Sequence, residues 1–358
     1  MREIQITSPR ASLSAYLVAG YALLIAYASL SPFSGWQEQG LEFSAVLTAP
    51  LLQQYTWFDI AANVLTYLPF GLLLCLALRV RFGTGWSVLF ATMGGVAISA
   101  AMEYAQMYLP VRFSSNLDLL ANSMGALAGA LGASIAPRAW FTYFMQWRMW
   151  LFHHGSEVDF GLALVALWMF AQINPSLPML GVVFISEVLH RPFVAVTAAP
   201  FNWLESTAVA LNLLMLGVLL LTLLRRRRHV EIVLLLLCLV ALAKFIAAAV
   251  LLKSWALLLW LNSEAMLGIT AGLLILLVAG RLSYIRLMFF AVMVTLVYLA
   301  LAHGILDSSA PSAAMRLYQW NYGHLLNYNG LSQTITLVFP LLMLAYIWRI
   351  RNRGEMAL

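Results

Sequence analysis

Apolar runs of about 20 residues recur along almost the whole chain, and they restrict its fold more than any other feature. A helix of that length spans the hydrocarbon core of a bilayer. Because 63% of the 358 residues are hydrophobic, the chain has more apolar surface than a soluble domain can bury. Inside lipid, the backbone must satisfy its own hydrogen bonds, which leaves helices or a closed barrel. The runs lack the alternation of barrel strands, so the sequence predicts an all-α polytopic integral membrane protein.

Ten segments have the length and composition of transmembrane helices. They cover residues 13–31, 57–78, 86–109, 116–136, 158–174, 203–224, 230–252, 254–280, 285–304 and 334–348. Cys75 and Cys238 lie inside two of these segments, which is typical of small core residues and not of a disulfide framework.

The distribution of basic residues gives these segments an orientation. One side, which includes both termini and alternate loops, has fifteen arginines. The opposite side has four basic residues, Arg112, Arg191, Lys253 and Arg316, while Lys244 lies within a segment. Cytoplasmic loops are enriched in Lys and Arg, so we expect both termini in the cytoplasm.

The net charge of +6 is thus explained by topology, with Arg225–Arg228 anchoring a helix end among anionic headgroups. Membrane lipids are the expected partners, and nucleic acid is not.

A pattern of acidic residues and glycines occurs twice. In each copy an acidic residue stands 12 positions before a glycine, and a Gly-x-x-x-Gly motif follows that glycine after 54 or 51 residues. The positions are Asp59, Gly71, Gly125 and Gly129 in one copy and Glu205, Gly217, Gly268 and Gly272 in the other. We therefore expect two degenerate four-helix units in parallel orientation, 1–140 and 141–282. Residues 283–358 then form a two-helix extension with an aromatic outer loop at 305–333.

Polar side chains gather at one end of the first unit, although charged residues make up only 9% of the chain. They occur on three predicted helices, mostly at spacings of three or four residues, which place them on one helix face. Ionisable groups within membrane helices commonly mark functional sites. The pattern predicts a ligand-binding site, and its candidate residues are Asp59, Asn63, Glu103, Gln106, Arg112, Asp118 and Asn122.

The glycines of the first unit are expected to determine how these helices pack. Gly125 and Gly129 form a small-xxx-small ridge that allows close approach of a neighbouring helix, and Gly71 is expected to have a packing role as well. If the neighbour is one of the two preceding helices, the carboxylates of the site converge around Arg112. A purely structural clamp of this kind is the alternative to a functional site.

The polar residues and glycines of the first unit follow a recognisable order. That order is Asn63, Pro69-Phe70-Gly71, Glu103-x-x-Gln106, Arg112, and Asp118-x-x-x-Asn122-x-x-Gly125-x-x-x-Gly129. It resembles the VanZ-like family over about residues 15–136. The resemblance implies a four-helix domain of the bacterial cell envelope, in the cytoplasmic (inner) membrane. The namesake of the family is linked to resistance to the glycopeptide antibiotic teicoplanin, but the resemblance supplies no mechanism.

The second unit departs from this pattern, because Gln106 and Arg112 have no counterparts in it. It contains Lys244 and Glu264 at depths compatible with an ion pair between neighbouring helices. We expect its buried charges to be structural. The aromatic residues of 305–333 are typical of an interfacial segment, and a surface that binds sugar rings is the alternative.

Three functions are compatible with the sequence. The favoured one is binding, without transport, of a lipid-linked or glycopeptide-like amphipathic ligand at the outer leaflet, with its polar head among Glu103, Arg112 and Asp118. The second is an intramembrane enzyme acting on a lipid-linked envelope substrate, such as a cell-wall or glycan precursor, with Glu103 and Asp118 as acid and base. The third is a lipid or small-molecule transporter or flippase. No cofactor or metal is expected, because the histidines lack zinc spacing and there is no Walker loop.

Overall fold

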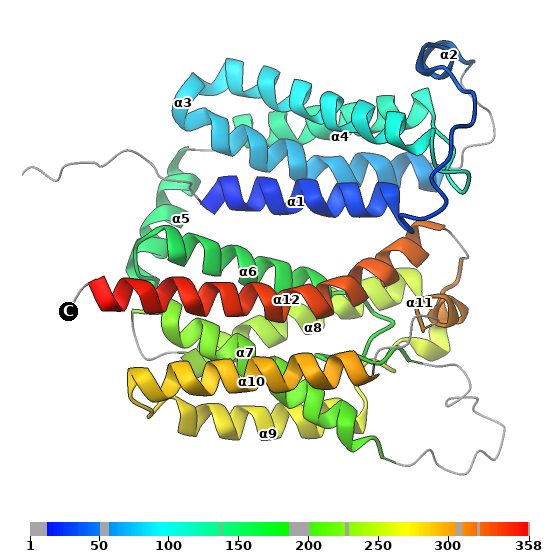
Figure 1. Cartoon of the computed structure of the whole chain (residues 1–358). Coiled ribbons are helices and arrows are strands. Elements are labelled where there is room, and N and C mark those ends of the chain that lie inside the picture. The colour runs from blue at the N-terminus through cyan, green and yellow to red at the C-terminus, as the bar shows by residue number, and fades with distance from the viewer. Residues whose placement is uncertain are drawn as a thin grey trace, which may run out of the picture. The chain divides into compact units, whose positions relative to one another are not determined.

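Every named secondary-structure element in the described part of the computed structural model is a helix. The described ranges are 13–50, 57–136, 138–185, 201–225, 229–305, 310–320 and 323–356. The chain divides into two units, Met1–Arg148 and Met149–Leu358, each of which is described by itself (Figure 1). The boundaries expected near residues 140 and 282 stay predictions.

The first unit is built around a helical hairpin and a third helix packed against it. Its helices are α1 (Leu13–Leu30), α2 (Phe43–Thr48), α3 (Trp57–Gln106) and α4 (Asn116–Ile135), and α5 (Arg138–Leu151) follows across the boundary. The 50 residues of α3 form two arms, because Gly83 has a φ of 73°, a left-handed conformation that favours glycine. We call residues 57–82 the first arm and 84–106 the second arm (Figure 1).

The core of the first unit lies where α1, the first arm and α4 meet. Ile25 of α1, Phe70 of the first arm and Ala126 of α4 are buried together there. A second buried group joins Cys75 of the first arm to Ala91 of the second arm. Both arms of α3 and the helix α4 therefore form one packed body, as the ridge of glycines suggested.

Glycines allow α4 and the first arm to approach at the level of their backbones. A Cβ atom on Gly125 would overlap the backbone at Val64, and one on Gly129 would overlap the backbone at Leu68. A Cβ atom on Gly71 would meet the backbone of Ala126 on α4 in the same way. Small residues let membrane helices pack this closely, since lipid supplies no hydrophobic force to hold them together.

The second unit is arranged around α7, most of which is buried. Its longer helices are α6 (Ser156–Gln172), α7 (Trp203–Leu223), α8 (His229–Leu251), α9 (Ser263–Ala279), α10 (Tyr284–Ile305) and α12 (Gly323–Met356). Short turns of helix, η2 (Ser254–Ala256), α11 (Ala310–Ala313) and η3 (Ala314–Leu317), lie between them. Gly268 and Gly272 of α9 lie against α7, which is the same kind of contact as that of α4 with the first arm.

Two segment boundaries differ from the sequence prediction. The segment expected at 254–280 begins its α-helix at Ser263, because the side chain of Asn262 accepts the Ala265 N–H and caps the helix there. The segment expected at 334–348 is part of the longer helix α12, which continues through the polar residues before it. Polar residues lowered the apolar signal of that stretch without interrupting its helix.

Six helices in the described part of the chain are long and apolar enough to cross a membrane. They are α1, α3, α7, α8, α10 and the segment Leu325–Arg351 of α12. A helical membrane protein is therefore the class to which the chain belongs. The count of ten crossings stays a prediction, as does the parallel arrangement of the two repeats.

Two glycines of α4 provide a test of the close contact. We expect Gly129→Ala to lower the unfolding temperature, because its Cβ overlaps the backbone at Leu68 and overpacking costs about 1–3 kcal/mol. Gly132→Ala is the matched control, since Gly132 has no atom within 4 Å of the position of a Cβ. Thermal unfolding of both variants in detergent measures the difference. Equal unfolding temperatures would contradict the close contact.

Candidate functional site

The predicted site residues lie at one end of the first unit, which we call the Arg112 end. Here α1 and the second arm end, and the first arm and α4 begin. The structure brings four of the seven candidates together: Asn63, Glu103, Asp118 and Asn122. Gln106 and Arg112 instead bind the end of α1. Asp59 is half-buried in the first turn of the first arm.

A two-layer cluster is formed by pairs of side chains four residues apart on three helices. The pairs are Asn63 and Tyr67 on the first arm, Ser99 and Glu103 on the second arm, and Asp118 and Asn122 on α4. Residues four apart lie one above the other on a helix face. The layer nearer the helix ends therefore has the two carboxylates, and the deeper layer has hydroxyl and amide groups.

The first layer joins two carboxylates through one amide. Asn63 Nδ2 donates a hydrogen bond of 2.5 Å to Asp118 Oδ1. Asp118 is also close enough to Glu103 for the two carboxylates to repel each other. Such a pair is costly in an interior of low dielectric constant unless a proton or a cation is shared between the carboxylates.

The second layer is a chain of hydrogen bonds in which one acceptor atom has no partner. Asn122 Nδ2 donates to Ser99 Oγ at 2.9 Å, and Ser99 forms a side-chain hydrogen bond with Tyr67. Asn122 Oδ1 is buried and has no hydrogen-bond partner among the described residues. Tyr67 and Ser99 were not among the predicted residues. Their spacing of four from Asn63 and Glu103 is the signal that could have found them.

Glu103 connects the second arm to the start of α4. Its side chain is only 4% exposed, and Oε2 accepts the Ser115 N–H at 2.8 Å and the Ser114 hydroxyl at 3.1 Å. Ser115 is itself the N-cap of α4, since its hydroxyl accepts the Leu117 N–H. The carboxylate therefore fixes the loop at the point where α4 begins.

Arg112 caps the end of α1 and does not pair with Glu103, in contrast to the clamp that the sequence suggested. Its Nη2 donates to the carbonyl oxygens of Ser31 at 2.7 Å and Ala28 at 3.1 Å, and its Nε also binds Ser31. Gln106 adds a hydrogen bond of 3.0 Å to the carbonyl oxygen of Ser29. The last carbonyl groups of a helix lack intrahelical donors and attract positive charge. Burial lowers the pKa of the guanidinium from its usual value.

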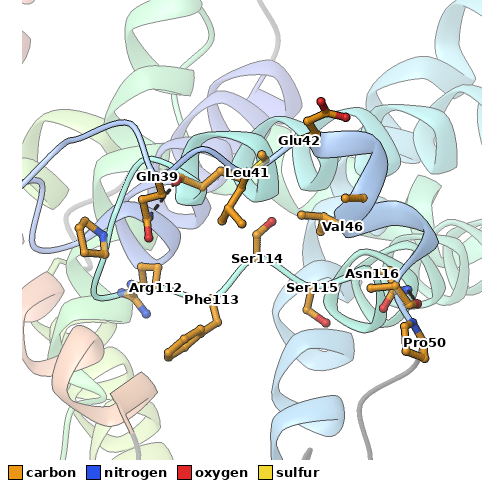
Figure 2. A pocket seen from close by; sticks show the side chains of 14 residues that line it. Gln39, Leu41, Glu42, Val46, Pro50, Arg112, Phe113, Ser114, Ser115 and Asn116 are labelled. Carbon is orange, nitrogen blue, oxygen red and sulfur yellow. Dashed lines mark hydrogen bonds between the residues drawn. The ribbon is translucent and has the colours of Figure 1, made fainter.

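A cavity of about 420 Å³ lies between residues 39–50 and the loop that contains Arg112 (Figure 2). Its wall is mostly apolar, with Leu41 and Val46 on one side and Phe113 on the other. Ser114 and Ser115 also line it, so the residues that bind Glu103 separate the carboxylate from the cavity.

The segment that covers this cavity is held in place by polar contacts with the backbone. Gln39 Nε2 donates to the carbonyl oxygen of Met107 at 2.7 Å, and Asn116 Nδ2 donates to that of Ala49 at 2.6 Å. The sequence does not indicate that residues 39–50 cover a cavity, because they have neither a strong apolar period nor charged pairs.

The second unit also caps a helix end with a cation. Lys244 is fully buried on α8, and its Nζ donates to the carbonyl oxygens of Gln172 at 2.8 Å and Asn174 at 2.6 Å, where α6 ends. Lys244 therefore binds backbone carbonyl groups and does not form the expected ion pair with Glu264. Glu264 accepts the Asn202 N–H and the Ser263 hydroxyl instead.

Within the described part of the aromatic segment 305–333, some side chains are buried and others are exposed. Tyr318 is 2% exposed and donates to Asn329 Oδ1 at 2.8 Å. Burial raises the pKa of Tyr318 to about 12. Trp320 is 41% exposed and lines a second cavity of about 520 Å³. The expected position at the membrane interface therefore applies to the part of the segment around Trp320.

The described residues contain no group of three or more His, Cys, Asp or Glu side chains placed to hold a metal ion. The fold and the site thus define a helical membrane protein with a polar cluster at one end of its first unit. Residues 12–137 match the VanZ/LLP1 family model, which confirms the VanZ-like resemblance of this segment. Comparisons with curated proteins and with solved structures gave no match.

The position of Glu103 predicts different effects for two substitutions. Glu103→Ala removes the acceptor of the buried Ser115 N–H, so we expect a loss of about 1–3 kcal/mol in the free energy of unfolding. Glu103→Gln keeps an oxygen acceptor and should retain most of this stability. Thermal unfolding measures both, with Glu38→Ala as an exposed control. Equal losses for the two Glu103 variants would contradict the structural role of the carboxylate oxygen.

Proposed function

We propose that the VanZ-like unit binds a lipid-linked or glycopeptide-like amphipathic ligand in the cavity at the Arg112 end. The observation that carries the proposal is the composition of the cavity, in which an apolar wall meets a guanidinium. Its volume of about 420 Å³ falls in the range of known small-molecule sites. Such a cavity suits a polar headgroup that remains attached to an apolar chain.

Arg112 is the group that would hold an anionic head. Its hydrogen bonds to Ser31 and Ala28 use Nε and Nη2, and within the described ranges Nη1 has no protein acceptor. The same bonds fix the plane of the guanidinium before a ligand arrives, which lowers the entropic cost of binding. A phosphate or carboxylate that accepts from Nη1 gains a charge-assisted hydrogen bond.

The proposed ligand reaches this cavity from the outer leaflet of the bacterial inner membrane. The side of the membrane follows from the basic residues, because Arg112 lies on the side with four of them and the opposite side has fifteen. The precursors of cell-wall and surface glycans, which combine a long lipid with a phosphorylated head, have the chemistry that the cavity suits. Transport is not part of the proposal.

Filling the cavity should reduce binding without removing any hydrogen bond. We expect Ala45→Phe, which places a ring in the cavity, to weaken binding of a fluorescent polyprenyl phosphate in phosphatidylcholine nanodiscs by about tenfold or more. Leu47→Phe is the matched control, because Leu47 is on the same short helix, is exposed and does not line the cavity. Fluorescence anisotropy gives both affinities, and equal affinity of Ala45→Phe and wild type would refute the site.

A second candidate function, an intramembrane enzyme, is favoured by one contact. The hydroxyl of Ser114, which lines the cavity, donates to Glu103 Oε2 at 3.1 Å. A carboxylate beside a hydroxyl or a water molecule at the cavity wall has the geometry of a general base. Turnover of a lipid-linked phosphate by purified protein would support this candidate, and turnover that persists in Glu103→Gln combined with Asp118→Asn would remove both carboxylates from the mechanism.

A further inference from the structure

We propose that the two-layer cluster at the Arg112 end binds one small monovalent cation, with sodium as the ion of suitable size. The cation would lie among Glu103 and Asp118 in the first layer and Asn122 in the second. This site is separate from the cavity of the proposed function, because Ser114 and Ser115 lie between them. The inference does not depend on an amphipathic ligand.

The charge of the cluster is the first observation. Glu103 and Asp118 are close enough to interact electrostatically, and both belong to helices of the packed first unit. Arg112 is the nearest basic residue in the sequence, but its guanidinium binds the carbonyl groups at the end of α1. No basic side chain of the described ranges forms a hydrogen bond with Glu103. The negative charge therefore lacks an internal cation on the Glu103 side.

The unpaired amide oxygen is the second and independent observation. Asn122 is 6% exposed, and its Oδ1 has no partner in the described structure although its Nδ2 is bonded to Ser99. Buried polar atoms are almost always paired, and a bound ion or water molecule is one explanation of an exception. An amide oxygen one helical turn below a carboxylate is a typical ligand of a hard cation.

A third oxygen is available from Glu103. The Ser114 and Ser115 hydrogen bonds both reach Oε2, so Oε1 has no protein donor among the described residues. Asp118, whose Oδ1 accepts from Asn63, is the second carboxylate of the first layer. Carboxylate and amide oxygens of the second arm and α4 thus belong to one polar cluster, together with the hydroxyl groups of Ser99 and Tyr67.

The composition of the cluster favours a monovalent ion. Divalent cations prefer several carboxylates or imidazoles, whereas this part of the structure has no group of three His, Cys, Asp or Glu side chains. The two carboxylates repel each other, and one monovalent cation between them would relieve this repulsion. The proposed site is also close to the end of the helix, since Glu103 lies three residues before the end of α3, about 5 Å along the helix axis.

The first experiment compares cations on the purified full chain. We expect the unfolding temperature to be higher in sodium chloride than in N-methyl-D-glucamine chloride at equal ionic strength, and radioactive sodium to bind with saturation. Asn122→Leu should weaken sodium binding by about tenfold or more and abolish the sodium effect on unfolding. Glu103→Gln, which retains the acceptor of the Ser115 N–H, should have the same effect and serves if the leucine variant does not fold.

Asn212 of α7 provides the matched control. It is buried like Asn122, but its amide accepts from Trp168 Nε1 and donates to the Leu180 carbonyl oxygen. Asn212→Leu should therefore lower the unfolding temperature while leaving sodium affinity unchanged.

Identical unfolding of the wild type in both salts, or unchanged sodium affinity in Asn122→Leu, would overturn the proposal and indicate that water alone satisfies Asn122. Ala45→Phe should keep full sodium binding, so the failure of the cation site and the failure of the proposed function are distinguishable. A protein that binds lipid but shows no sodium effect overturns this inference alone.

Discussion

The last carbonyl groups of α1 have no donors within their own helix, and the way they are satisfied determines the rest of the Arg112 end. Arg112 and Gln106 supply the donors, which fixes the loop after α3 against the end of α1. A guanidinium used in this way is not paired with Glu103. Glu103 then accepts the backbone N–H of Ser115 from the loop, and this fixes the N-cap residue of α4. The end of α1 therefore explains why the guanidinium of Arg112 lies where it does and why Glu103 does not pair with it.

The second unit satisfies a helix end by the same physical means but with different residues. Lys244 reaches the carbonyl groups of Gln172 and Asn174 from within α8. Glu205 accepts the Val182 N–H, as Glu103 accepts that of Ser115. In both units, buried charged side chains bind backbone groups at helix ends or in the loops between helices. Unpaired backbone groups are costly where water is scarce, so this use of rare charges is expected in a membrane protein.

The sequence predicted those features that depend on composition and spacing. Apolar runs placed the helices, and the spacing of Gly125 and Gly129 identified a ridge that the structure places against the first arm. The order of the polar residues and glycines along the first unit identified the VanZ-like segment. The partners of Arg112 and Lys244 could not be predicted, because their acceptors are backbone carbonyl groups, which every residue has. The cover over the cavity was missed for a related reason: Gln39 and Asn116 hold it through the backbone.

The positions of the two proposed sites follow from the way α4 packs. Gly125 and Gly129 bring the backbone of α4 against the first arm, and Asn122 lies one turn before Gly125. The amide of Asn122 donates to Ser99 with Nδ2, and its Oδ1 has no hydrogen-bond partner among the described residues. A buried oxygen in this position suits an ion or a water molecule as its partner. Beyond Ser114 the wall is formed by the short helix α2 with its flanking residues and by the loop that contains Arg112, and the cavity there, about 420 Å³, is large enough for a headgroup. The proposed ion site therefore lies beside the close helix contact, and the proposed ligand site lies beyond the start of α4.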